Sequence, residues 1–359
     1  MEVPEIAMIN YDIYDRILGC LVTAGMGDAV GAPSEAMSRT EIIEKFGGPI
    51  TRFRDPGDNL YAKGNLVGEG TDDASQMYEM AKAVVKTNGN LTVKAAAEAI
   101  VNWSKNYPKY YPRNQGPTTS QVINSLIEGK DPVEVGKVGR AYNRGTSNGA
   151  AMRVASAGLC CPNDLDKAIK NATVMSKPSH GTQHAFAGAS AIACGISKAM
   201  TENTDMYSVL KACIYGAENG ERIGLKEARV ASGPSIIPKL LKAIDLAISS
   251  HSMDEALEKL EYEIGNDGSI QVSVSVAIGI FALAQGEPIK TILGGANIGG
   301  DTDTIACIAG SLAGAYTGFS KIPIKWYRVY KKANPKLDFE CISKDLAKIA
   351  KESLKGIRI

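Results

Sequence analysis

The feature that most constrains the fold is the helical spacing of apolar residues, which continues over most of the 359-residue chain. Residues three and four apart lie on one side of an α-helix, so apolar residues at that spacing predict a helix with one buried face. The stretch TDDASQMYEMAKAVVK is an example, with Thr71 or Asp72 placed to cap the helix start. Its apolar stripe consists of Met77, Met80, Ala81, Val84 and Val85. With an aromatic content of only 6%, this pattern predicts an all-α protein.

Similar stripes predict further helices along the chain. They cover residues 92–104, 117–128, 183–200, 204–218, 235–249, 254–262, 270–285, 301–316 and 342–355. Small residues such as Ala306, Gly310 and Gly314 recur within several of these segments, and small side chains let neighbouring helices approach closely. We therefore expect a compact, single-domain orthogonal helical bundle that spans residues 1–359.

Two segments do not have a helical pattern. Residues 47–70 are rich in glycine and contain two prolines, and residues 106–117 interleave proline with tyrosine and basic side chains. Loops of this length in a compact domain are often functional, so we expect both to flank one cleft. Tyr107, Tyr110 or Tyr111 could stack on a base, or they could pack their loop onto the body of the protein.

The charge balance argues against nucleic-acid and membrane partners. Forty basic and thirty-nine acidic residues leave a formal net charge of +1, and no block of five or six like charges occurs. Binding to a phosphate backbone or an anionic membrane would call for such a block. The N-terminus MEVPEIAMINYD carries acids and a proline where a signal peptide would have basic residues and an apolar core. We expect a cytoplasmic protein.

The seven cysteines are odd in number and lack any C-x-x-C pair. Most are flanked by alanine, glycine and aliphatic residues. This pattern favours buried, reduced thiols over a disulfide or a structural zinc site.

The stretch GCLVTAGMGDAVGAPSE first suggests a nucleotide-binding turn, because Gly25-x-Gly27-x-x-x-Gly31 is similar to a dinucleotide fingerprint. Asp28 follows the second glycine directly, however, and a carboxylate there would repel a phosphate. Pro33 follows within the next turn, and no β-α-β pattern comes after it. The segment 16–31 is therefore predicted to be a helix, and a strand at 17–24 would revive the dinucleotide interpretation.

Two Asp/Thr clusters, GEGTDDAS and NIGGDTDTIA, each follow glycines and open a long apolar helix. Acids in a first helical turn usually cap the helix, but four carboxylates and several hydroxyls exceed what two caps need. Asp301 and Asp303 can converge only if the chain is still in a turn there, which Gly299 and Gly300 permit. Clustered carboxylate and hydroxyl oxygens are ligands for Mg²⁺, Mn²⁺ or Ca²⁺ rather than zinc or copper. Four carboxylates could neutralise two such ions.

Five motifs together resemble the ADP-ribosylglycohydrolase family, which includes the dinitrogenase reductase-activating glycohydrolase and the J1 crystallins. They are GCLVTAGMGDAVGAPSE, GEGTDDASQMYEMAKAV, GTSNGAAMRVA, SHGTQH and NIGGDTDTIACIAGSLAGA, in that order over about 300 residues. The resemblance implies an all-α fold, a centre with two Mg²⁺ or Mn²⁺ ions, and hydrolysis at C1″ of an ADP-ribosyl group.

The resemblance also implies roles for individual residues. The implied metal ligands are Thr71, Asp72, Asp73, Asp301, Asp303 and Thr304. Asp28 and Glu35 would lie at the ribose pocket beside the metals, and Asn148 and Gly149 would contact the substrate. Gly116 matches a family glycine beside the substrate more loosely.

Three histidines occur in the chain. The resemblance makes His180 a substrate contact, although a structural role is also open. His184 stands four residues later without further zinc ligands, and we expect a structural role. His251 precedes a predicted helix and is most simply a surface residue.

Cleavage at an anomeric carbon requires an activated water and stabilisation of a developing oxocarbenium ion. Glu35, Asp301 or both in succession could orient or deprotonate that water. The substrate would be an ADP-ribosylated protein or an ADP-ribose-type small molecule, and arginine, serine and acetyl linkages all remain open. The alternatives are a hydrolase of a smaller ribosylated metabolite, a non-catalytic protein similar to J1 crystallin, and an ADP-ribose-binding module without turnover. Retention of the four aspartates and of Glu35 argues against the last two.

Overall fold

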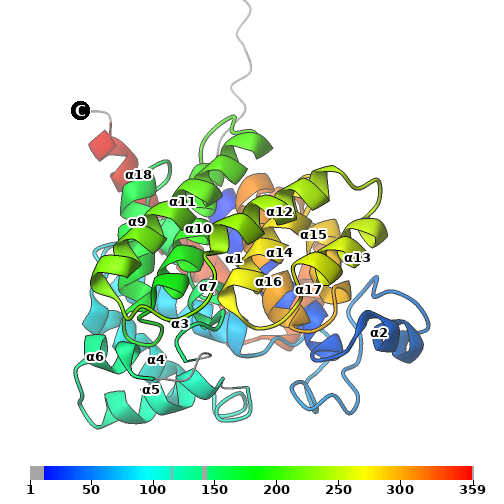
Figure 1. Cartoon of the computed structure of the whole chain (residues 1–359), viewed down its shortest axis with the longest axis horizontal. Coiled ribbons are helices and arrows are strands. Elements are labelled where there is room, and N and C mark those ends of the chain that lie inside the picture. The colour runs from blue at the N-terminus through cyan, green and yellow to red at the C-terminus, as the bar shows by residue number, and fades with distance from the viewer. Residues whose placement is uncertain (1–11, 115, 140–143, 358–359) are drawn as a thin grey trace, which may run out of the picture.

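The computed structural model describes residues 12–114, 116–139 and 144–357, and within these ranges it is helical with no β-strand (Figure 1). Its only β-type pairings there are two isolated bridges, Ser147 with Ser269 and Thr182 with Arg229. The all-α prediction is confirmed. The N-terminal segment that we compared with a signal peptide lies almost wholly outside the described residues.

The helices follow one another along the chain, most of them with short connections. They are α1 (Ile13–Gly31), η1 (Ala32–Ser34), α2 (Arg39–Phe46), α3 (Asp72–Lys86), α4 (Val93–Asn106), α5 (Pro117–Ile127), α6 (Pro132–Lys137), α7 (Gly149–Met152), α8 (Ala155–Leu159), α9 (Leu165–Ser176), α10 (Gln183–Ala199), α11 (Met206–Glu227), α12 (Ile236–Ile248), α13 (Met253–Glu263), α14 (Ile270–Leu283), α15 (Pro288–Asn297), α16 (Thr302–Thr317), η2 (Phe319–Lys321), α17 (Ile324–Ala333) and α18 (Phe339–Ile357). Residues 47–70 contain no helix, as predicted. Of the second predicted loop, 106–117, the first residue belongs to α4 and the last to α5, and the described residues between them contain no helix.

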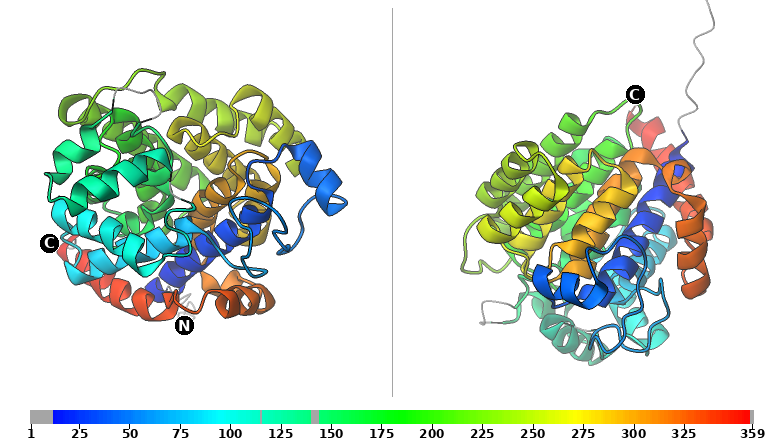
Figure 2. Two further views of the ribbon diagram at one scale, coloured as in Figure 1. Left: turned by 90° about the horizontal axis from the view of Figure 1, so that it is seen from below. Right: turned by 90° about the vertical axis from the view of Figure 1, so that its right-hand side faces the viewer.

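Four helices, α1, α10, α14 and α16, are buried along nearly their whole length and form the centre of the molecule. The remaining helices surround them, and α17 and α18 lie along the same side, next to α1 (Figure 2). This arrangement explains why the central helices are apolar on every face, because no face of theirs meets water.

The glycines of α1 are explained by its packing against α16, the most extensive helix contact in the protein. A Cβ atom on Gly27 would lie 2.3 Å from the carbonyl oxygen of Ala306, and one on Gly31 would lie 2.5 Å from the Cα of Asp303. Only glycine allows so close an approach. The glycines that resemble a nucleotide-binding turn are therefore a helix contact surface, and it brings the end of α1 against the start of α16.

By length and composition alone, residues Ile13–Ser34 could cross a membrane. Their apolar window is 100% buried inside the protein, however, so the core accounts for its composition.

Six of the seven cysteines are buried and all seven are free thiols, but Cys341 is exposed. The expectation of buried thiols is therefore wrong for Cys341. Cys341 lies on the side of α18 that faces solvent. Its local sequence, FECIS, mixes polar and apolar residues, unlike the apolar surroundings of most other cysteines.

Candidate metal centre and substrate cleft

A cleft of about 390 Å³ brings the two Asp/Thr clusters together, although they are far apart in the sequence. Its walls contain both loops predicted to flank it, through Tyr61 from the first and Arg113 from the second. The predicted residues that line it are Glu35, Asp72, Asp73, Gly116, Asn148, Gly149, Asp301, Asp303 and Thr304. Asp28, Thr71 and His180 lie behind this surface and contact the residues that form it.

Asp28, in the last turn of α1, supports one wall of the cleft from behind. Its side chain caps the N-terminus of a different helix, α3. Its carboxylate accepts hydrogen bonds from the backbone N–H groups of Thr71 and Ala74, at 2.8 to 3.0 Å, and from the Thr71 hydroxyl at 2.9 Å. The residue at the helix start, Thr71, makes no side-chain cap of its own. A negative group is favourable at a helix N-terminus, so Asp28 fixes α3 where it presents Asp72 and Asp73 to the cleft.

Gly299 and Gly300 build the opposite wall. Both have positive φ values, +79° and +66°, which L-residues with side chains rarely adopt. Two backbone hydrogen bonds of Gly300, each 2.8 Å long, hold the turn: its carbonyl accepts from the N–H of Ala36, and its N–H donates to the carbonyl of Met37. The predicted turn before α16 is thus present, and it carries Asp301 and Asp303 into the cleft on the same side as Glu35.

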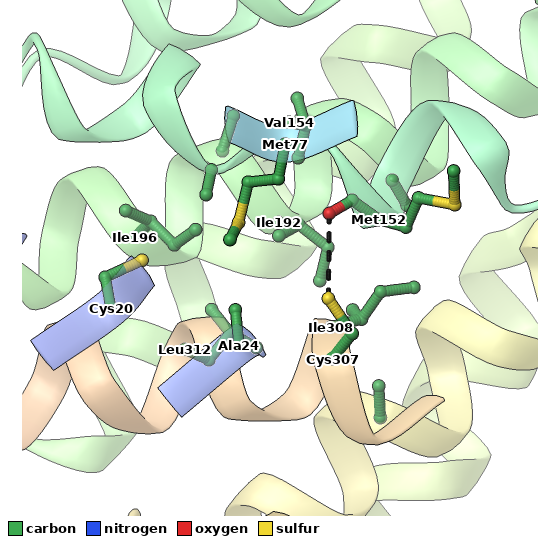
Figure 3. Packing of buried hydrophobic residues seen from close by; sticks show 14 of the residues in the cluster. Cys20, Ala24, Met77, Met152, Val154, Ile192, Ile196, Cys307, Ile308 and Leu312 are labelled. Carbon is green, nitrogen blue, oxygen red and sulfur yellow. Dashed lines mark hydrogen bonds between the residues drawn. The ribbon is translucent and has the colours of Figure 1, made fainter. Parts of the chain in front are cut away.

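The apolar core beneath the cleft fixes the two helix starts relative to each other. Met77 lies one turn after Asp73 in α3, and Cys307 lies one turn after Asp303 in α16. Figure 3 shows both in one cluster with Met152, whose carbonyl accepts a weak hydrogen bond from the Cys307 thiol at 3.9 Å. Because buried side chains in such a cluster are closely packed, the carboxylates above them are held in place.

The carboxylate oxygens form two groups that share Asp303. One consists of Asp28, Asp73 and Asp303, and the other of Glu35, Asp301 and Asp303, with ligand atoms within 4.8 Å of one another in each. Asp28 already accepts several hydrogen bonds, whereas Asp73 Oδ1 and Glu35 Oε2 are buried without a partner in the described part of the chain. Two unsatisfied buried oxygens on either side of Asp303 are what a pair of bound cations would satisfy.

Burial and mutual repulsion raise the pKa values of these carboxyl groups. Burial is the largest cause for each of them, followed for Asp72, Asp73 and Glu35 by the charge of Asp303. The pKa of Asp303 itself rises to about 7 and that of Asp28 to about 6.

No lysine or arginine in the described part of the chain forms an ion pair with this acidic group. Arg153 interacts electrostatically with Asp72 and Asp73, but its link to Asp72 runs through Gln76, so several buried carboxylates share one indirect counter-charge. Such a group is costly unless a cation compensates it. An all-oxygen set of this kind fits hard divalent cations. The cluster is therefore a buried acidic site suited to metal binding. Asp72 is outside both oxygen groups and accepts a hydrogen bond from Gln76 at 2.9 Å.

The loop before α7 holds the α16 side of the site. The side-chain amide of Asn148 donates to Asp301 Oδ2 at 2.6 Å and to Ser273 Oγ at 2.9 Å. Gly149 lies against the ring of His180, which is fully buried. His180 reaches the cleft only through Ser147, whose hydroxyl is 2.9 Å from His180 Nε2. Direct substrate contacts by Asn148, Gly149 and His180 stay predictions.

The two long loops are joined where they line the cleft. Arg113 donates to the carbonyl of Lys63 at 2.9 Å, and Asn114 donates to the carbonyl of Tyr61 at 2.8 Å. Tyr107 and Tyr110 are buried and packed against each other, so they attach the second loop to the protein body. Of the two roles open for these tyrosines, packing is the one observed.

Sequence reasoning missed several residues of the site. Ser147, Tyr61 and Arg113 line the cleft, and Gln76 and Arg153 lie behind it. Ser147 and Arg153 both fall within the motif GTSNGAAMR, which the sequence analysis had singled out. Their polar side chains in an otherwise apolar segment could have marked them as candidates.

Comparison with known proteins shows the family of the chain. A model of the ADP-ribosylglycohydrolase family matches residues 10–355. The chain belongs to the ADP-ribosylglycohydrolase family.

Its relatives include both assigned and unassigned members. The chain is 31% identical to the Escherichia coli protein YegU, described as uncharacterized, over 86% of this chain and 89% of that protein. It is 28% identical to human ADP-ribosylhydrolase ARH3, over 87% and 88% of the two chains. It is 25% identical to the ADP-ribosyl-[dinitrogen reductase] glycohydrolase of Rhodospirillum rubrum, over 89% and 91%.

A solved structure has the same fold. It is titled an ADP-ribosylglycohydrolase-related protein complex and superposes with a TM-score of 0.67 at 20% identity, over 94% of this chain and 99% of that one. This similarity agrees with the all-α architecture described above.

Proposed function

We propose that this protein is a hydrolase that depends on two Mg²⁺ or Mn²⁺ ions and cleaves the C1″ glycosidic bond of an ADP-ribosyl group. The proposal rests on two sets of carboxylate oxygens that share Asp303, which lines the cleft. Membership of the family supports an ADP-ribose-containing substrate.

In this proposal the ions are held by Asp73, Asp301 and Asp303, with Asp72, Thr71 and Thr304 completing the site. When bound, such ions would supply positive charge that orients ribose hydroxyls and makes a nearby water easier to deprotonate. Every one of these residues lies at or just before the start of α3 or α16. The protein thus holds the site on two rigid helices rather than on the loops.

The remaining chemistry is assigned to Glu35 and Asp301. Asp301 is held by the Asn148 amide, so it can orient a water without moving. Glu35 belongs to the same oxygen group, and its Oε2 has no hydrogen-bond partner among the described residues, so it is free to accept a proton from the attacking water. The bond between C1″ and the acceptor then breaks, and water supplies the new oxygen at C1″.

The experiment is a release assay on arginine-, serine- and acetyl-linked ADP-ribose in parallel, in EDTA and with Mg²⁺ or Mn²⁺ restored. We expect ADP-ribose release from at least one substrate, only with metal, and a loss of at least 100-fold in Asp303→Asn. Asp345→Asn, on α18 away from the cleft, is the matched control. Metal-independent release would contradict the mechanism, and no release from any substrate would contradict the function.

A further inference from the structure

Arg153 is a fully buried arginine behind the cleft, and the reaction proposed above does not use it. Its side chain is only 1% exposed, and burial lowers its pKa to about 10. One end of the guanidinium donates to Gln76 Oε1 at 2.5 Å, and the Gln76 amide donates in turn to Asp72. Arg153 is thus joined to the acidic cluster through one amide group.

The other end of the guanidinium faces His180. Its Nη2 donates to Ser179 Oγ at 2.5 Å and lies 3.3 Å from His180 Nδ1, which is also 2.8 Å from Ser179 Oγ. A guanidinium can only donate hydrogen bonds, so a proton on Nδ1 would face Arg153 Nη2 and would compete with it for Ser179 Oγ. A bare Nδ1 instead accepts the Ser179 hydroxyl hydrogen, which leaves Ser179 Oγ to accept from Arg153. Burial and the charge of Arg153 lower the pKa of His180 well below its usual value, which leaves the ring neutral.

A neutral ring without a proton on Nδ1 carries its proton on Nε2. His180 Nε2 is 2.9 Å from Ser147 Oγ, so the ring donates and Ser147 accepts. The hydroxyl hydrogen of Ser147 is then not needed for His180. Ser147 lines the cleft, where that hydrogen can be donated to a ligand.

We propose that Arg153 is a positioning residue that holds His180 in the Nε2–H tautomer and thereby makes Ser147 a hydrogen-bond donor to an acceptor oxygen of the substrate. The identity of the ligand, an ADP-ribosyl group, rests on the proposed function. The tautomer and its dependence on Arg153 do not.

The first test reads the tautomer directly. The chain has 3 histidines, so long-range ¹H–¹⁵N spectra of histidine-labelled protein resolve each ring, and His180→Gln assigns the signal. We expect a protonated Nε2 and a bare Nδ1 on His180 in the wild type. Arg153→Met should give a mixture of tautomers, and Arg153→Lys, which keeps a donor near Nδ1, should restore the single form. A proton on Nδ1 in the wild type, or an unchanged spectrum in Arg153→Met, would overturn the proposal. If Arg153→Met does not fold, the wild-type spectrum still decides the tautomer, and Arg153→Gln takes its place as the test of the dependence on Arg153.

The second test measures binding of ADP-ribose, without turnover, by calorimetry. Ser147→Ala should weaken the Kd about tenfold or more, and Ser147→Thr, which keeps the hydroxyl, should recover most of the loss. Ser320→Ala, which removes a hydroxyl bonded to Asp15 away from the cleft, is the matched control. An unchanged Kd in Ser147→Ala overturns the donor role. If the tautomer and binding results hold but no linked ADP-ribose is hydrolysed, the proposed function fails and the positioning role stands.

Discussion

Replacing Asp303 with asparagine should have opposite effects on stability in the absence and presence of metal. In the metal-free protein the pKa of Asp303 is raised from 3.8 to about 7, chiefly by burial. The native state therefore binds more protons than the unfolded state between these values, and its stability falls as the pH rises through that window. A shift of about three units corresponds to a ceiling of about 4 kcal/mol above pH 7.

Asparagine cannot ionise, so it removes the cost of burying a charged Asp303 while keeping nearly the same side-chain shape. Because the neighbouring carboxyl groups titrate together and share protons, we expect about half the ceiling, or roughly 2 kcal/mol. In EDTA at about pH 8, Asp303→Asn should thus be more stable than the wild type by about that amount. Near pH 4 the difference should fall below about 1 kcal/mol, because this pH lies close to the unfolded-state pKa of 3.8, where the penalty has only begun to accumulate.

Bound metal should make the wild type more stable than Asp303→Asn. A cation that binds only the native state adds about 2.7 kcal/mol at a hundredfold excess over its Kd, and the variant has lost the carboxylate shared by both oxygen groups. The assay is urea denaturation at both pH values, with and without Mn²⁺, with Asp345→Asn as the control. The reasoning is refuted if Asp303→Asn is less stable than the wild type in EDTA at the higher pH, or if Mn²⁺ stabilises both proteins equally.

Three further predictions follow from other parts of the structure. Glu35→Gln should lower kcat by at least about 100-fold while the Kd for ADP-ribose changes only a few-fold, in steady-state kinetics and calorimetry; an equal loss in both would show a binding role instead. Gly27→Ala should destabilise the protein by roughly 1–3 kcal/mol on denaturation despite the helix propensity of alanine, because the new Cβ would lie 2.3 Å from the Ala306 oxygen. A gain in stability would mean that α1 and α16 can separate at no cost. Native protein should take up one maleimide, at Cys341, because the other six thiols are buried; rapid labelling of more than one site by mass spectrometry would contradict the packing.

The helices with strong one-sided stripes could be predicted from the sequence, because burial of an apolar face determines their periodicity. The prediction for 235–249 differs by one residue at each end from α12 (Ile236–Ile248). The prediction for 204–218 ends too early, since α11 continues to Glu227. Gly216, Gly220 and Gly224 look like helix breakers in the sequence, but in the structure they pack against α10 at distances no side chain would fit. Helices α2, α6, α7, α8, α9, α15 and α17 were not predicted. Most of them are short, and a short helix depends on its neighbours for stability.

The carboxylates of the site could be predicted because several acids following glycines exceed what helix caps require. The arrangement behind them could not. That Asp28 caps α3 depends on how closely α1 approaches α16, and the contacts of Arg153 with Gln76, Ser179 and His180 join three separate segments. Such contacts are set by tertiary packing, which the periodicity of a sequence does not contain.

Anomalous scattering from crystals grown with Mn²⁺ can show whether the acidic cluster between α3 and α16 is a metal centre. We expect two anomalous peaks in the cleft, about 3.5–4 Å apart, with Asp303 bonded to or between both. Asp303→Asn crystals should lose at least one of the two peaks. No peak in the cleft at millimolar Mn²⁺, or peaks only at surface carboxylates, would contradict the account.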